Sequence, residues 1–201
     1  MSLIDTPVAH RLDVQSHGAA MDAHEFDAVT DWDRDYQFEL IHGVVVVSPI
    51  TSEGEAGPND ELAFLLRQYR NKHPAGNVID DTLPERYVHL LDGSRRRADR
   101  VVWAGLGRTP DPKIDVPAIV IEFVSRSHRD RRRDYVEKRE ESRTVGVKEY
   151  WVIDRFESQM SVYSIDGSER MIHAQETYQT PLLPGFELPL GRLIAIANRW
   201  P

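Results

Sequence analysis

The sequence contains no cysteine, and it has no apolar stretch long enough to suggest a membrane span. Without cysteine, a disulfide framework, a thiolate nucleophile and every cysteine-based zinc site are excluded. A membrane-spanning helix needs about 20 apolar residues, and the first thirty residues also lack the apolar run of a signal peptide. These absences fit a reducing compartment, so we expect a cytoplasmic protein that has no membrane partner.

Basic residues are fewer than acidic ones, 25 Lys and Arg against 33 Asp and Glu, and the formal net charge of the chain is −8 at pH 7. Residues 1–35 hold eight acids against two arginines, a balance of −6, so the remainder carries only −2. Within that remainder, arginines cluster at 95–97 with Arg100 and again between Arg126 and Arg133. Because local charge decides whether a surface attracts phosphate, these clusters indicate either a phosphate-binding face or two solvated loops.

Length and composition favour one globular domain. The chain has 201 residues, of which 29% are charged and 40% hydrophobic, an ordinary globular balance. Residues 1–30 are polar, and His10, His17 and His24 are seven apart without further ligands nearby. We therefore predict a flexible or loosely docked acidic arm over residues 1–30 and a single domain over residues 31–201.

The first half of this domain reads as a hairpin, a helix and short strands. Residues 36–41 and 44–47 flank His42-Gly43 as in a β-hairpin, and residues 49–58 read as a loop. From Asn59, a suitable N-cap, apolar residues recur at helical spacing; these are Leu62, Leu65, Leu66 and Tyr69. Strands are then expected at about 77–83, 85–91 and 98–104.

The second half contains a strand–helix–strand unit. Residues 118–124 are apolar on both faces, as in a strand covered on both sides, and a polar helix is expected at about 129–145. A strand at 147–153 follows, which is the pattern of a parallel crossover, and strands at 160–165 and 169–173 suggest an antiparallel finish. The expected class is α/β, with a mixed central sheet flanked by helices and antiparallel hairpins toward both ends.

Two acidic residues lie on these expected strands. Strand alternation places Asp99 on the face of Val101 and Trp103, and Glu122 on the face of Val120 and Val124. An ionised glutamate in so apolar a strand is costly unless an arginine, a lysine or a metal ion pairs with it. A structural salt bridge is one explanation. Two carboxylates that converge and are relieved by a divalent cation are the other.

Five blocks of sequence, spanning about residues 36–155, carry a family resemblance. They are Phe38-Glu-Leu-Ile-His-Gly43 with Ser48-Pro49, Ala98-Asp-Arg-Val-Val102, Val120-Ile-Glu-Phe-Val-Ser125, Asp134-Tyr-Val-Glu-Lys138 and Gly146-Val-Lys-Glu-Tyr-Trp-Val-Ile-Asp154. In their order and spacing they resemble the Uma-type restriction endonucleases of the PD-(D/E)XK nuclease superfamily. The resemblance implies a restriction-endonuclease-like fold.

The resemblance also implies a four-residue catalytic site. Asp99 and Glu122 would be ligands of Mg²⁺ or Mn²⁺, Glu39 a supporting acid, and Lys138 the catalytic lysine. In the wider superfamily the lysine lies two residues after the glutamate, where this chain has Val124. In the Uma-type pattern the lysine comes from the following helix, as Lys138 does.

Four arginines are candidates for contacts with nucleic-acid phosphate, namely Arg97, Arg100, Arg129 and Arg132.

Two of the candidate catalytic residues, Glu39 and Lys138, have simpler explanations. Glu39 could be an exposed hairpin acid, and Lys138 follows Asp134 by four residues, the spacing of a surface ion pair on a helix.

The expected function is a metal-dependent phosphodiester hydrolase, an endonuclease acting on nucleic acid and most readily on DNA. The main alternative is a nuclease fold that has lost catalysis and binds nucleic acid or regulates. A glycosidase-type carboxylate pair is a weaker alternative. A homodimer would suit double-strand cleavage, because two sites would then be related by symmetry.

Overall fold

The computed structural model describes residues 11–125 and 133–200. The chain divides into two compact units, the first formed by Met1–Ile50 with Leu91–Arg96 and the second by Thr51–Leu90 with Arg97–Pro201. The sequence instead predicted an arm and one domain. The division falls inside the predicted domain because the hairpin at 36–49 groups with the residues that precede it.

The first unit is built from short elements around a small core. They are β1 (Arg11–Leu12), η1 (Val14–Ser16), α1 (Ala23–Asp27), β2 (Asp31–Trp32), β3 (Tyr36–Ile41) and β4 (Val44–Pro49). The β3–β4 hairpin is antiparallel and turns at His42 and Gly43, which both have positive φ. Strand β3 also pairs with the first residue of β6 (Arg95–Ala104), through Leu40 and Arg95.

Residues 11–30, predicted as an arm, have defined structure from Arg11 onward. Leu12 and Phe26 are 2% and 1% exposed, and Trp32 packs its ring 5.2 Å from that of Phe26. The carboxylates of Asp13 and Asp22 cap η1 and α1 by accepting backbone N–H groups. These capping residues are polar, so composition alone made the segment look unstructured.

The second unit has a mixed sheet with strand order β10-β9-β8-β7-β6, and β5 also pairs with β6. Its strands are β5 (Ile79–His89), β6, β7 (Ile119–Phe123), β8 (Glu149–Asp154), β9 (Gln159–Ser164) and β10 (Glu169–His173). Strands β7 and β8 are parallel, whereas β6–β7, β8–β9 and β9–β10 are antiparallel. The predicted parallel crossover between β7 and β8 is confirmed.

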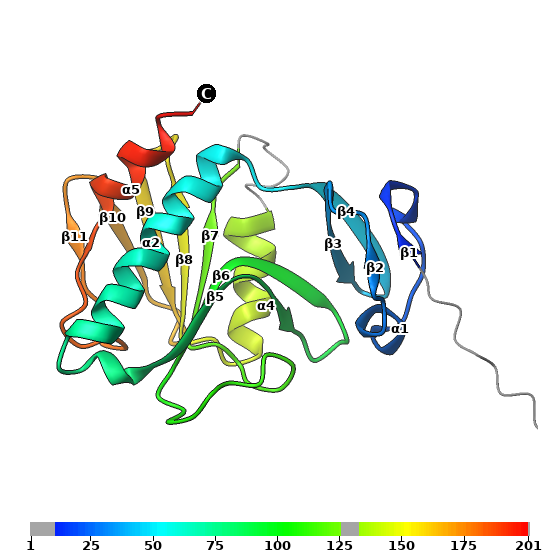
Figure 1. Cartoon of the computed structure of the whole chain (residues 1–201), viewed down its shortest axis with the longest axis horizontal. Helices are drawn as coiled ribbons and strands as arrows, with labels where there is room; N and C mark the ends of the chain where they lie inside the picture. The colour runs from blue at the N-terminus through cyan, green and yellow to red at the C-terminus, as the bar shows by residue number, and fades with distance from the viewer. Residues whose placement is uncertain (1–10, 126–132, 201) are drawn as a thin grey trace, which may run out of the picture. The chain divides into compact units, whose positions relative to one another are not determined.

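Helices and short segments complete this unit (Figure 1). They are α2 (Glu53–Lys72), η2 (Gly76–Val78), the π-helical turn η3 (Arg133–Glu137), α4 (Lys138–Thr144), β11 (Thr177–Tyr178), β12 (Leu188–Pro189) and α5 (Leu190–Ala197). One buried cluster joins α2 and α5 to Ile119, Ile121 and Trp151. A second joins Val120, Val124 and Val152 to residues beside α4. The sheet is therefore covered on both faces.

The helix predicted from Asn59 begins six residues earlier, at Glu53. Its apolar stripe is buried as predicted, but residues 53–58 are helical and not a loop. The backbone N–H of Ser52 donates to the Glu55 carboxylate at 2.9 Å, which is a capping interaction. The sequence predicted a loop here because this first turn contains glycine and proline. A Cβ at Gly54 would lie 2.6 Å from the Arg155 guanidinium, so a larger residue at this position would require the arginine side chain to shift.

Two predicted strands, 77–83 and 85–91, form the single strand β5. The strand continues past Pro84, and Glu85 has a φ of 52°. Among the described helices, none is long and apolar enough to cross a membrane.

Candidate active site

Glu122 lies near the end of β7 and is almost fully buried, with 2% of its surface exposed. The neighbours Ile119, Ile121 and Phe123 point into the cluster under α2, whereas Val120 and Val124 belong to the cluster on the α4 side. Alternation places Glu122 on the α4 side, as the sequence predicted. A carboxylate at this depth needs a compensating charge or several donors.

Lys138 supplies that charge. Its ammonium Nζ lies 3.1 Å from Glu122 Oε1 and donates to the backbone carbonyl of Arg97 at 2.7 Å. Lys138 is only 5% exposed, so it is not the solvent-exposed surface lysine that the simpler explanation required. Because α4 crosses back over the sheet, its first residue faces β6 and β7.

Asp99 lies on the strand that pairs with β7. Arg100 pairs with Ile121 in the antiparallel register, so one step further along that register places Asp99 opposite Glu122. The Phe123 N–H donates to Asp99 Oδ2 at 2.7 Å, which brings this carboxylate to the residue next to Glu122. Directly opposed side chains share a face of the sheet. Asp99 remains partly exposed, so this side of the pair is accessible from solvent.

Asn59, which the sequence suggested as a helix N-cap, instead lies inside α2 and holds β6 at this point. Its side-chain N–H donates to the backbone carbonyl of Asp99 at 2.9 Å, and its Oδ1 accepts from Arg100 Nε at 2.6 Å. Arg100 also donates to the hydroxyl of Thr82 and is 1% exposed. Burial lowers the pKa of Arg100 to about 10. This placement favours a structural role for Arg100 over contact with phosphate.

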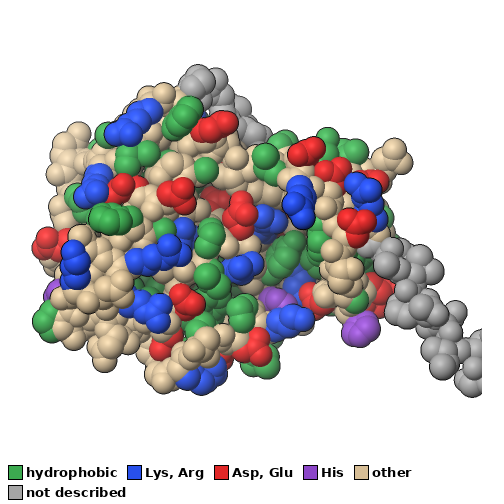
Figure 2. Space-filling model, viewed as in Figure 1, with side chains coloured by type: hydrophobic (Ala, Val, Ile, Leu, Met, Phe, Trp, Pro, Cys, Tyr) green, Lys and Arg blue, Asp and Glu red, His purple; other side chains and the backbone are tan. Residues whose placement is uncertain are grey.

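The other arginine candidates have different surroundings. Arg97 Nη2 lies 2.8 Å from Glu85 Oε2, and its side chain is 22% exposed. Arg129 and Arg132 lie outside the described residues. On the face over α2 and α5, basic and acidic side chains are interspersed (Figure 2). Arg192 of α5 and Glu61 of α2 form an ion pair, with Arg192 Nη2 2.5 Å from Glu61 Oε1.

Glu39 lies on β3 in the first unit, paired in register with Val46, and it is 5% exposed. The alternative explanation, that Glu39 is an exposed hairpin acid, is therefore wrong. Asp99, Glu122 and Lys138 all lie in the second unit.

Sequence reasoning missed an acid at the end of β8. Asp154 is 0% exposed, and its Oδ1 accepts from the N–H groups of Phe156 and Glu157 at 2.9 and 3.1 Å. Its Oδ2 accepts from the hydroxyl of Tyr135 at 3.1 Å. Tyr135 belongs to the π-helical turn that leads directly into Lys138. A polar residue at the end of a buried parallel strand was the signal that could have identified Asp154.

The donors at this site suit a hard divalent cation in kind. Mg²⁺ is commonly held by one or two carboxylates and keeps several waters, so Asp99 and Glu122 offer sufficient protein ligands. In residues 11–125 and 133–200, no group of three or more His, Asp or Glu side chains is gathered as for a metal ion. Any cation bound by Glu122 would also have to share that carboxylate with the ammonium of Lys138.

Comparison with known proteins places this chain in a family. No curated protein matches the chain. The fold is similar to the crystal structure of "a putative nuclease belonging to DUF820" from Anabaena variabilis, with a TM-score of 0.71, 14% identity, and coverage of 88% of this chain and 99% of that one. The family model described as "Putative restriction endonuclease" matches residues 23–191, and the chain belongs to this Uma2 family.

Proposed function

We propose that this protein is a metal-dependent endonuclease that hydrolyses phosphodiester bonds in nucleic acid, with DNA as the substrate. The observation that carries the proposal is the placement of Glu122 and Lys138, 3.1 Å apart, with Asp99 at the adjoining register position. Membership of a family described as restriction endonucleases, and a nuclease-like fold, support it.

In this proposal Asp99 and Glu122 hold Mg²⁺ or Mn²⁺. The bound cation would polarise the scissile phosphate and lower the pKa of a water. Lys138 keeps a positive charge beside the carboxylates, where it would offset negative charge that develops on the phosphate. The Arg97 carbonyl fixes the ammonium, so little reorganisation is needed when the phosphate arrives.

The same pair also favours a second candidate. Glu122 and Lys138 neutralise each other in a buried setting, so the arrangement is complete without a metal ion. A chain of this kind could bind nucleic acid without cleaving it, or act as a regulatory module.

A plasmid-nicking assay separates these functions. Supercoiled plasmid is incubated with the protein and Mg²⁺, Mn²⁺ or EDTA, and the variants Asp99→Asn and Glu122→Gln are compared with Glu187→Gln, a matched change at an exposed residue. We expect nicking only with metal, loss of nicking in both site variants, and full activity in the control. Nicking that persists in either site variant would contradict the assigned site. Binding of plasmid without cleavage under every condition would favour the inactive module.

Metal binding can be measured independently of cleavage. A ligand that binds only the folded state stabilises it by about 2.7 kcal/mol at a hundredfold excess over Kd. We expect Mg²⁺ or Mn²⁺ to raise the melting temperature of the parent protein, and Asp99→Asn to abolish the rise. An equal rise in Asp99→Asn and the parent would exclude Asp99 as a ligand.

A further inference from the structure

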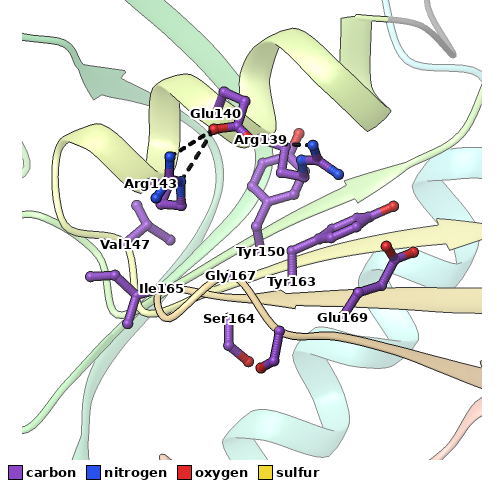
Figure 3. A pocket seen from close by; sticks show the side chains of 11 residues that line it. Arg139, Glu140, Arg143, Val147, Tyr150, Tyr163, Ser164, Ile165, Gly167 and Glu169 are labelled. Carbon is purple, nitrogen blue, oxygen red and sulfur yellow. Dashed lines mark hydrogen bonds and ion pairs between the residues drawn. The ribbon is translucent and has the colours of Figure 1, made fainter.

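A hollow in the second unit lies apart from the acidic pair. It has a volume of about 320 Å³ and is formed between α4 and the β9–β10 hairpin (Figure 3). Helix α4 contributes Arg139, Glu140 and Arg143, and the hairpin contributes Tyr163, Ser164 and Glu169. The volume is within the range of small-molecule sites, about 300–1,000 Å³.

Two adjacent residues of α4 contact different strands of the sheet. Lys138 reaches β7 through Glu122, whereas the guanidinium of Arg139 lies 4.6 Å from the ring centroid of Tyr163 on β9. Asp99, Glu122 and Lys138 do not line the hollow. The hollow is therefore a second place where a ligand could bind, on the other flank of the same helix.

The arginines of this hollow are already held in position. Arg139 Nη2 lies 3.0 Å from Glu140 Oε1, and Arg143 Nη2 lies 3.1 Å from Glu140 Oε2. One carboxylate thus bridges two guanidinium groups. Hydrogen bonds from Arg143 and Arg139 lower the pKa of Glu140, so that it remains ionised. Because the Glu140 side chain is 48% exposed, it can turn to solvent and leave both arginines to another oxyanion.

The rest of the hollow suits a planar group that donates hydrogen bonds. Tyr163 offers an aromatic ring, and Gly167 adds no side chain above the hairpin. Glu169 pairs with Tyr163 in the strand register and brings a carboxylate to the same region (Figure 3). That carboxylate would repel a second anionic group but would accept hydrogen bonds from N–H or hydroxyl groups.

We infer that this hollow is a binding site for a nucleoside monophosphate unit. The phosphate replaces the Glu140 carboxylate between Arg139 and Arg143, and the base packs beside the Tyr163 ring, which the Arg139 guanidinium already covers on one face. Glu169 and Ser164 accept or donate hydrogen bonds to the base and sugar. The unit is either a free nucleotide or the phosphorylated end of a strand, since both present the same chemistry.

Isothermal titration of the full chain with AMP in EDTA tests the site without involving the proposed metal centre. We expect saturable binding with a Kd below about 1 mM, and binding at least tenfold weaker for adenosine and for inorganic phosphate alone. Arg143→Gln should weaken AMP binding about tenfold or more, while Arg199→Gln, a change at an exposed arginine elsewhere, should leave it unchanged. Tyr163→Leu should weaken AMP binding but not phosphate binding.

Two further arms separate the ligand source and the dependence on nuclease activity. A 5′-phosphorylated tetranucleotide that displaces AMP would identify strand ends as ligands, and failure to displace it would identify the free nucleotide. Glu122→Gln should bind AMP like the parent, because Glu122 lies outside the hollow. Absence of saturable AMP binding, or equal binding in Arg143→Gln and the parent, would overturn the inference whatever the outcome of the nicking assay.

Discussion

Replacing Lys138 by methionine tests how the buried ion pair is held. Methionine preserves an unbranched side chain of similar length but removes the ammonium that lies 3.1 Å from Glu122 Oε1. The two side chains are only 6% and 3% exposed, so water cannot readily solvate the carboxylate left behind. Removing one partner of a buried pair typically destabilises a protein by about 3–5 kcal/mol.

The size of the expected thermal shift follows from this loss. For a chain of this length, about 1 kcal/mol corresponds to about 2–4 °C, so Lys138→Met should melt roughly 6–20 °C below the parent. Urea unfolding followed by tryptophan emission should give the same loss, because Trp103 and Trp151 are buried in the second unit. Nuclease activity of the variant should fall about 10²-fold or more, the scale of one lost charge-stabilising group.

The double variant Glu122→Gln with Lys138→Met is the matched control. It removes both charges, and replacing a buried ion pair by uncharged groups is often nearly neutral. Its stability should therefore recover most of the loss seen in Lys138→Met, which gives a coupling energy of about 2 kcal/mol or more. A single variant that loses less than about 1 kcal/mol, the level of a surface pair, would refute the reasoning.

Two further predictions concern hydrogen bonds of buried side chains. Tyr135→Phe removes the hydroxyl that donates to Asp154 Oδ2, in the turn that leads to Lys138. The kcat of cleavage should therefore fall with KM unchanged, and the free energy of unfolding should fall by about 1 kcal/mol. An unchanged kcat would show that this contact does not position Lys138. Burial, and then the neighbouring Glu149, raise the pKa of Tyr178. The phenol of Tyr178 therefore keeps its proton above pH 10 in the folded state, whereas in the unfolded chain it loses it. The free energy of unfolding should decrease as the pH rises above 10. Tyr178→Phe should make the decline of urea midpoints between pH 10 and 12 shallower, and an equal decline in the variant would contradict this assignment.

Local pattern in the sequence determined much of the second unit. The alternation of apolar residues along β7 was enough to assign Glu122 to one face and to require a partner for it, because side-chain direction in a strand has a period of two. The stripe from Leu62 to Tyr69 identified α2 for the same kind of reason, and the parallel crossover followed from the order of elements. These features depend on neighbours within a few residues.

Tertiary structure decided which distant residues meet. Three contacts depend on how separate segments pack. Lys138 lies against Glu122, Arg100 is enclosed beneath α2, and Asp154 accepts a hydrogen bond from Tyr135. The sequence left Lys138 with two explanations, since its spacing from Asp134 suits a surface helix equally well. Only the crossover of α4 over the sheet makes burial of the ammonium possible, and burial is a property of the packed layers, which no local period encodes.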